Sequence, residues 1–301
     1  MSIIASVKNR RVDISLLLVA ALWGASYLSA KTLTEHAPVL TVLSLRFIST
    51  STAMAMIWFI RRDRITKPEW LLGIGLGSSQ ALILFFETTG VSKTSATNAG
   101  LIISLAIIFT PILESIASKN WLPRSFFVAT VTAVVGVALL VSDKGFATPG
   151  LGDWLMLAAA ITRAIHVTAM GHLTTGKSYS SVSITLLQSI TCGVIYTAFS
   201  LDGVQDALST FDAGLWLDLA FLSLLCGAFA FLVTMWAIRK TSSSRASLLL
   251  GTEPVWAVIV GISLGGESLA LLGFLGAALI IGSSYFGQKI ETRHRLHASV
   301  N

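Results

Sequence analysis

Residues 93–101 read KTSATNAGL, and residues 240–248 read KTSSSRASL, so five of the nine aligned positions are identical. Each copy opens a long apolar run that contains a proline, and each later reaches a Gly-Xaa-Ala-Leu stretch, at residues 136–139 and 276–279. Features that recur in one order along a chain indicate an internal repeat. We therefore expect two related halves.

The composition of the chain is that of a membrane protein. Of 301 residues, 54% are apolar and 12% are charged, against about 25% charged residues in soluble domains. Too few polar residues are present to cover a water-soluble core, whereas an apolar outer surface is stable in lipid. The net charge of +6 does not indicate nucleic-acid binding, because the basic residues lie at the ends of apolar runs and not in one patch. Cys192 and Cys226 both lie inside apolar runs, which excludes a disulfide framework or a zinc site.

Ten apolar runs are long enough to cross a bilayer, whose core of about 30 Å needs roughly 20 residues of helix. They cover residues 14–33, 38–60, 70–90, 95–117, 124–142, 150–172, 181–201, 214–238, 245–265 and 269–287. The first run follows a basic segment, as a signal peptide does, but nine similar runs come after it. We interpret it as an uncleaved first helix, and we expect an all-α polytopic protein of ten transmembrane helices.

The basic residues orient these helices. With a cytoplasmic N-terminus, sixteen of the 21 Lys and Arg residues lie in cytoplasmic segments, and the longest outer loop carries Asp202, Asp206 and Asp212. Because cytoplasmic loops are enriched in Lys and Arg, we expect both termini to be cytoplasmic. The protein would be a multi-pass protein of a bacterial inner membrane.

An odd number of helices in each half makes the two halves inverted. We expect helices 1–5 over residues 14–142 to form one five-helix repeat and helices 6–10 over residues 150–287 to form the other. Inverted repeats place a substrate site at their interface near the middle of the membrane, and access to it alternates between the two faces.

Three ionisable residues lie deepest in the predicted helices, namely Arg46, Arg163 and Glu253. Each costs about 2.5–3.5 kcal/mol at the bilayer centre and so needs a partner or a wet cavity. His166 follows Arg163 by three residues, which puts both on one helix face. Two interpretations stay open: an ion pair that locks helices together, or a cavity in which arginines face an anionic group. In the second, Glu253 or His166 carries a proton.

Other residues are weaker candidates for the substrate site. Trp23, Ser26 and Tyr27 lie in the middle of the first helix, where they could form a ligand wall or pack plainly against another helix. By contrast, Glu87 and Lys31 fall near the outer edge of their helices and Glu114 near the inner edge, where long side chains reach water easily. We do not expect those three in the site.

No enzyme motif occurs in a structural context that would support it. Residues 261–265 read GISLG, which matches the nucleophile-elbow string, but that motif needs a strand before it and a helix after it. The sequence also contains no phosphate-binding loop and no His-Glu-Xaa-Xaa-His motif. We therefore predict no catalytic residue, no metal ligand and no cofactor.

Taken in order, these residues resemble the EamA branch of the drug/metabolite transporter superfamily. The likeness is carried by LWGASY at residues 22–27, LRF at 45–47, TSATNAGL at 94–101 with Pro111, and TSSSRA at 241–246 with Pro254. The resemblance implies two EamA repeats and export of metabolites, amino acids or drugs without ATP. It also implies a central cavity walled by the first four helices of each repeat, and it adds Asn98 to the candidate substrate-binding residues.

The sequence thus predicts a secondary transporter, an exporter, that moves a small organic solute across the inner membrane. Its partners would be the solute and the lipid bilayer, with proton coupling through Glu253 or His166 and no nucleic acid. Two alternatives remain: a membrane sensor or assembly partner without transport, and an intramembrane enzyme.

Overall fold

The computed structural model describes residues 3–94, 96–141, 150–265 and 271–298, and this part of the chain contains helices and no strand. The helices of the first half are α1 (Ile3–His36), α2 (Val39–Arg61), α3 (Lys67–Val91), α4 (Ala96–Ile103), α5 (Ala106–Ser118) and α6 (Arg124–Val141). Those of the second half are α7 (Leu151–Thr174), α8 (Ser181–Ala198), α9 (Leu201–Thr210), α10 (Ala213–Ala220), the π-helix η2 (Phe221–Phe229), α11 (Ala230–Ile238), α12 (Ser243–Leu250), α13 (Glu253–Gly265) and α14 (Leu271–Ala298). The all-α prediction is confirmed.

Seven helices in the described residues are long and apolar enough to cross a membrane. They are Arg10–His36, Val39–Arg61, Lys67–Val91, Leu151–Thr174, Ser181–Ala198, Ala213–Ile238 and Leu271–Glu291. The other predicted spans correspond to α6, to the pair α4 and α5, and to the pair α12 and α13. A count of ten spans therefore stays a prediction.

Two of the predicted runs are broken helices, which the sequence analysis did not foresee. The first break separates Ile103 from Ala106, and the second separates Leu250 from Glu253. In the alignment of residues 93–101 with 240–248, the two breaks fall at equivalent positions. At the second break Pro254 lies in the first turn of α13, where a missing backbone N–H costs no helix hydrogen bond.

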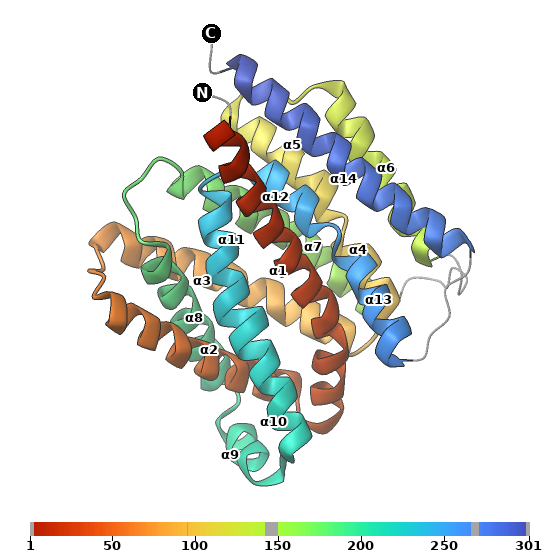
Figure 1. Cartoon of the computed structure of the whole chain (residues 1–301). Helices are drawn as coiled ribbons and strands as arrows, with labels where there is room; N and C mark the ends of the chain where they lie inside the picture. Colours follow the sequence, from red (N-terminus) through yellow and green to blue (C-terminus); the bar gives the residue numbers. More distant parts are fainter. Residues whose placement is uncertain (1–2, 95, 142–149, 266–270, 299–301) are drawn as a thin grey trace.

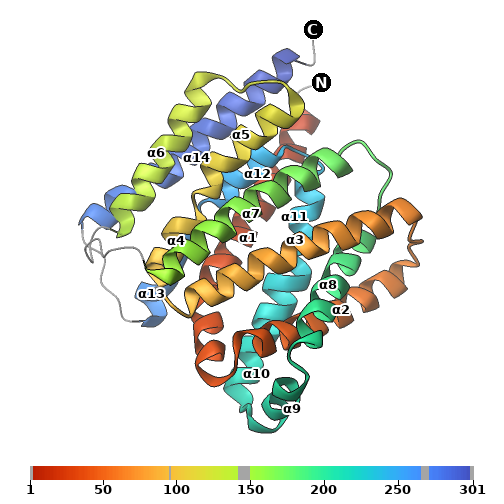
Figure 2. The same ribbon diagram turned by 180° about the vertical axis from the view of Figure 1, so that it is seen from behind.

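The loop expected between the seventh and eighth spans is also partly helical. It contains α9, in which Ala207 is buried while Leu201 and Leu208 are exposed. Asp212 then caps α10, because its Oδ1 accepts a hydrogen bond of 2.9 Å from the backbone N–H of Leu215. Both termini and the α5–α6 connection lie at one end of the molecule, and α9 lies at the opposite end (Figures 1 and 2).

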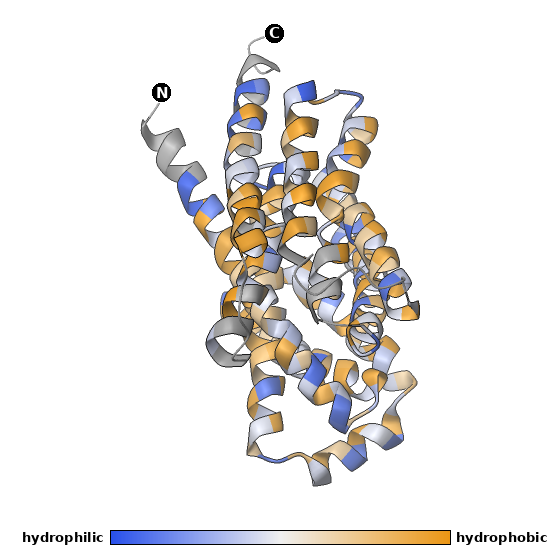
Figure 3. Cartoon of the chain, turned by 90° about the vertical axis from the view of Figure 1, so that its right-hand side faces the viewer, coloured by the Kyte–Doolittle hydropathy of each residue, from blue (hydrophilic) through white to orange (hydrophobic). Residues whose placement is uncertain are grey.

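The two halves are packed against each other, so that α2 contacts α8 and α3 contacts both α7 and α8. In contrast, α6 and α14 lie side by side at one edge (Figures 1 and 2). Apolar residues predominate along the length of the helices (Figure 3), and many large ones are exposed, such as Phe59 and Leu71. This surface is stable in lipid and not in water.

A glycine sets the distance between α1 and α13. A Cβ atom on Gly24 would lie 2.6 Å from the carbonyl oxygen of Glu253 and 2.8 Å from the backbone nitrogen of Ala257. The absent side chain lets the two backbones approach closely, as small residues do in membrane helix pairs. This contact carries Glu253 into the centre of the bundle.

Candidate functional site

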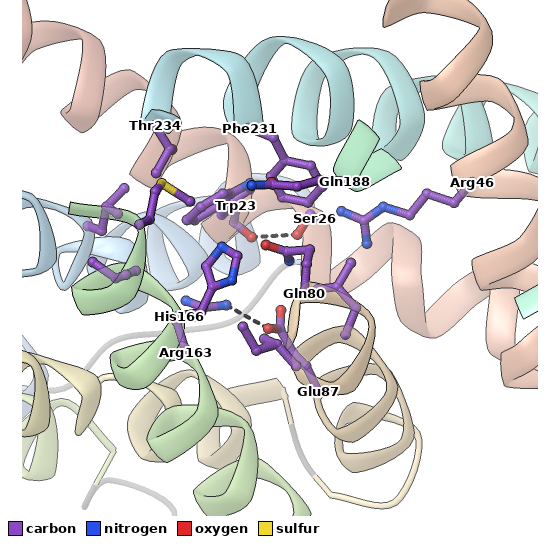
Figure 4. A pocket seen from close by; sticks show the side chains of 15 residues that line it. Trp23, Ser26, Arg46, Gln80, Glu87, Arg163, His166, Gln188, Phe231 and Thr234 are labelled. Carbon is purple, nitrogen blue, oxygen red and sulfur yellow. Dashed lines mark hydrogen bonds and ion pairs between the residues drawn. The ribbon is translucent and has the colours of Figure 1, made fainter. Parts of the chain in front are cut away.

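A cavity lies between the two halves of the protein, deep inside the bundle (Figure 4). Its walls come from α1, α2, α3, α7, α8, α11 and α12, and they are formed by Trp23, Ser26, Arg46, Gln80, Ile83, Leu84, Glu87, Arg163, His166, Val167, Met170, Gln188, Phe231, Thr234 and Leu250. About 40 Å³ of it is open to the centres of water molecules. This is room for a few waters, so the cavity has to widen to admit an organic solute. We call it the central cavity.

Arg163 on one wall is held by two carboxylates. Its Nη2 donates to Glu87 Oε2 at 2.6 Å, and its Nη1 donates to Glu253 Oε2 at 3.0 Å. The Tyr27 hydroxyl donates to the other oxygen of Glu253, Oε1. The guanidinium carbon of Arg163 also lies 5.4 Å from the ring centroid of Trp23, which is a cation–π distance. Four helices, α1, α3, α7 and α13, meet in this network, which we call the Arg163 cluster.

Arg46 has a different environment. It is 7% exposed, its Nε has no hydrogen-bond partner, and no carboxylate among the described residues pairs with it. Figure 4 shows its guanidinium pointing into the central cavity from the side opposite Arg163 and His166. A buried charge without a protein partner is expensive in a membrane, so water or a ligand has to satisfy it.

Three further polar atoms on the cavity walls lack hydrogen-bond partners within the described part of the chain. They are Nε2 of His166, Nε2 of Gln188 and Oγ1 of Thr234. The other ring nitrogen of His166, Nδ1, is 2.7 Å from the hydroxyl of Ser79, which holds the imidazole in place. Buried polar atoms are nearly always hydrogen-bonded in folded proteins. Their gathering around one space leaves its walls lined by polar groups that water or a polar ligand can satisfy.

A second, smaller cavity of about 20 Å³ lies at the two helix breaks, and we call it the break cavity. It is lined by Ile103, Ser104, Ala106, Ile107, Thr110, Arg163, Val167, Ser247, Leu250, Gly251 and Glu253. Arg163 lines both cavities. Arg163 therefore stands between the central cavity and the break cavity, together with Val167 and Leu250, which also line both.

The structure brings together most of the residues that the sequence analysis selected. The central cavity is lined by Trp23, Ser26, Arg46, Arg163 and His166. The other two whose side chains are described belong to the Arg163 cluster, namely Tyr27 and Glu253. Asn98 belongs to α4, but its side chain lies outside the described part of the structure.

Several cavity residues were missed by the sequence analysis: Gln80, Glu87, Gln188, Phe231 and Thr234. Glu87 was assigned to the outer edge of its helix, but its carboxylate binds Arg163 and lines the central cavity. A signal for the two glutamines existed, because each lies inside an apolar run and carries an amide that is costly to bury. No cluster of three or more His, Cys, Asp or Glu side chains with metal-binding geometry occurs in the described residues.

The sequence matches the EamA-like transporter family over residues 10–142 and 150–286. A relative from Escherichia coli (strain K12), named a "probable amino-acid metabolite efflux pump", is 27% identical over 92% of this chain and 94% of its own length. A relative of the same name from Salmonella typhimurium is 25% identical over 96% of this chain and 99% of its own. An "uncharacterized transporter" from Archaeoglobus fulgidus is 25% identical over 91% of this chain and 85% of its own.

One solved crystal structure superposes with a TM-score of 0.74 at 15% identity, over 94% of this chain and 98% of that chain. That likeness concerns the fold alone. The names of the relatives indicate a transporter and not an enzyme. The match to the family covers both halves of the sequence, and the chain belongs to the EamA-like transporter family.

Proposed function

We propose that the protein is a secondary transporter that exports a small zwitterionic solute of the amino-acid type across the inner membrane. The observation that carries the proposal is the contrast between the two walls of the central cavity. An unpaired cation, Arg46, lies on one side, and the carboxylate-rich Arg163 cluster lies on the other.

The charges on the two walls complement a zwitterion. Glu253 has both oxygens engaged, by Tyr27 and by Arg163. Glu87 gives one oxygen, Oε2, to Arg163, and its Oε1 has no hydrogen bond within the described residues. With both carboxylates ionised, the Arg163 cluster carries a net charge of −1, while Arg46 carries +1. A solute carboxylate would therefore bind the planar fork of Arg46, and its ammonium group would bind Glu87 Oε1.

The rest of the central cavity suits the remainder of such a solute. Trp23 and Phe231 meet edge to face, with ring centroids 6.0 Å apart, and form an apolar wall. Amides and hydroxyls without partners, at Gln188 and Thr234, are available for polar substituents. The names of the relatives from Escherichia coli and Salmonella, which refer to an amino-acid metabolite, support this class of solute.

Proton antiport is the energy source that we propose, with Glu253 as the proton carrier. Protonation of Glu253 would weaken its ion pair with Arg163 and would change the hydrogen bond from Tyr27. The contacts between α1, α7 and α13 would then differ between the two protonation states, as alternating access requires. His166 is the second candidate, since one of its ring nitrogens faces the cavity without a partner.

The membrane orientation in this proposal follows the charges of the loops, with both termini in the cytoplasm. The two matched ranges act as inverted repeats, and the central cavity lies at their interface. The equivalent positions of the two helix breaks support this relation.

Counterflow in proteoliposomes tests the function. Vesicles with purified protein are loaded with one unlabelled amino acid, and uptake of the same labelled amino acid is measured across a panel. We expect exchange of at least one apolar amino acid, which is competed by other zwitterions. The amide of the exchanged amino acid lacks the carboxylate, and its N-acetyl derivative lacks the ammonium group. Both derivatives should therefore compete poorly.

Two results would overturn the proposal. If no member of the panel exchanges, a role as a sensor or assembly partner without transport is favoured. If the amide and the N-acetyl derivative compete as well as the parent amino acid, the cavity does not recognise the two charged groups of a zwitterion. A matched preparation of the Arg46→Gln variant serves as the control for specific exchange.

A further inference from the structure

The break cavity is lined by hydroxyl groups that the solute site does not use. The side chain of Thr110 on α5 is fully buried, and its Oγ1 has no hydrogen-bond partner. Ser104 and Ser247 also line the cavity, and the Ser247 hydroxyl donates to the carbonyl oxygen of Ala106 at 3.1 Å. A space of this size and polarity fits one or two water molecules. Such water would lie against the carboxylate of Glu253, which lines the same cavity.

A third cavity, of about 150 Å³, lies at the other end of α5 and opens near the end of the molecule where the termini lie. We call it the terminal cavity. Its walls are formed by Glu114, Ser115, Ser118, Asn120, Leu122, Ser242, Glu291 and His294. Ser115 is 1% exposed, and its Oγ, like that of Thr110, has no partner.

Polar groups of α5 and α12 line the interval between these two cavities. The two helices pack against each other (Figure 1). Thr110 and Glu114 lie four residues apart and so occupy the same face of α5. Glu114 accepts hydrogen bonds from the backbone N–H groups of Ser243, at 3.2 Å, and Ser244, at 2.6 Å, and from the Ser244 hydroxyl. We call this line of residues the α5–α12 seam.

We propose that the α5–α12 seam is a hydrated path for protons between Glu253 and the cytoplasm, separate from the path of the solute. The inference rests on the proposed function, in which export is coupled to proton entry. Hydroxyl groups and water both donate and accept hydrogen bonds, so they can pass a proton along a chain. In the antiport cycle, protonated Glu253 gives its proton to a water in the break cavity and becomes a carboxylate. The hydronium formed passes its proton along the seam to the water of the terminal cavity.

The position of Arg163 gives this separation a physical basis. Arg163, Val167 and Leu250 line both cavities and form the partition between them, and Arg163 is ion-paired there with Glu253, which lines the break cavity. A solute in the central cavity meets the partition from one side, and a proton in the break cavity meets it from the other. The solute and the proton can therefore both act on the Arg163–Glu253 ion pair while they move through different cavities.

Glu114 also has a structural role, because a carboxylate at the N-terminus of α12 stabilises that helix. The test therefore uses Thr110 and Ser115, whose hydroxyls have no partner to lose. The double variant Thr110→Val/Ser115→Ala keeps the shape of both cavity walls and removes one hydroxyl from the break cavity and one from the terminal cavity. Thr130→Val is the matched control, since Thr130 is equally buried on α6 and its hydroxyl bonds to its own helix, at Phe126.

Two activities are measured in proteoliposomes: solute counterflow, which needs no net proton movement, and solute-driven proton flux, which is followed with a pH-sensitive dye. We expect the double variant to lose about tenfold or more of the proton flux, as when a positioned proton-transfer group is removed. Its counterflow should stay within about twofold of wild type, because the solute site is unchanged. The Thr130→Val control should keep both activities.

The possible results separate this inference from the proposed function. Wild-type proton flux in the double variant overturns the path and leaves the transporter proposal intact. Wild-type protein that exchanges solute without moving protons overturns both the coupling and the path. Equal loss of counterflow and proton flux in the double variant, with unchanged thermal stability, means that the seam serves the solute and not a separate proton path.

Discussion

The two sides of the central cavity each carry one arginine, and the two arginines have opposite surroundings. Arg163 has a carboxylate on each Nη atom and an aromatic ring over its face. Arg46 has no ion-pair partner among the described residues, although it is buried, with only 7% of its surface exposed. The residue type is the same on both sides. The difference teaches that the supply of neighbouring carboxylates separates an arginine that joins helices from one whose charge is left to water or a ligand.

The largest effect should come from removing the paired arginine, Arg163. Arg163→Ala leaves the carboxylates of Glu87 and Glu253 buried close together without a cation. Breaking a buried ion pair in this way costs about 3–5 kcal/mol, so we expect poor expression and a large drop in thermal stability in detergent. Arg163→Ala combined with Glu253→Gln should recover part of the stability. An Arg163→Ala protein as stable as wild type would show that the cluster does not hold the bundle together.

Removal of the unpaired arginine should have the reverse profile. Arg46→Gln deletes a charge that has no protein partner, so thermal stability should be unchanged or higher. Hydrogen bonds to charged groups are worth about 1.5–3 kcal/mol, which corresponds to a loss of about 10- to 100-fold in solute affinity. Counterflow as a function of solute concentration measures this loss. Arg46→Lys keeps the charge without the planar fork and should be intermediate. A stability loss as large as that of Arg163→Ala would make Arg46 a structural residue.

The hydroxyl of Tyr27 tests how far the Arg163 cluster extends. Tyr27→Phe removes the hydrogen bond to Glu253 and leaves the ring in place, at a cost of about 1–2 kcal/mol in stability. Because Glu253 is the proposed proton carrier, the dependence of export on pH should also shift, while counterflow at one fixed pH changes little. Tyr196→Phe is a matched control, since its buried hydroxyl donates to the Ala81 carbonyl at 2.5 Å and not to a member of the cluster. Equal pH profiles for Tyr27→Phe and wild type would remove Tyr27 from the coupling machinery.

The smallest effects should come from neutral groups on the walls of the central cavity, Gln188 and Thr234. Gln188→Leu and Thr234→Val each remove a polar atom that has no partner in the protein. A neutral hydrogen bond to a ligand is worth about 1 kcal/mol, so solute affinity should fall about fivefold in each variant without loss of stability. Direct binding or counterflow titrations resolve this difference. If neither variant changes affinity while both lower stability, these side chains pack the wall and do not contact solute.

Depth along a helix was a good guide to the charged residues of the site and a poor guide to Glu87. Arg46, Arg163 and Glu253 were found because each interrupts an apolar run far from its ends. Glu87 lies only a few residues from the end of α3 at Val91, so its position in the run suggested the membrane surface. In the structure α3 packs along α7, and this contact brings Glu87 against Arg163. The register between two helices is a tertiary property that a single apolar run does not contain.

The helix breaks show the same limit of sequence-based prediction, here for the backbone conformation. Residues 95–117 and 245–265 are apolar enough to be taken as continuous spans, and each contains a proline. The observed breaks begin after Ile103 and Leu250, and the first of them has no proline beside it. At the second break, a Cβ on Gly251 would overlap the side chain of Ile107 on α5. The close crossing of the two broken helices accommodates these turns, and neither helix by itself specifies it.

The sequence by itself determined that the protein is a helical membrane protein of two similar halves, because lipid restricts a chain with so few charges to apolar helices. It also determined which residues are too costly to bury without a reason. Only the tertiary structure decided which of them meet. Tyr27, Glu87, Arg163 and Glu253 come from four helices that are distant in the chain, and their contacts depend on crossing angles and helix registers. Arg46 lies beyond the reach of those carboxylates for the same reason, and its unpaired charge follows from packing and not from the residues around it in sequence.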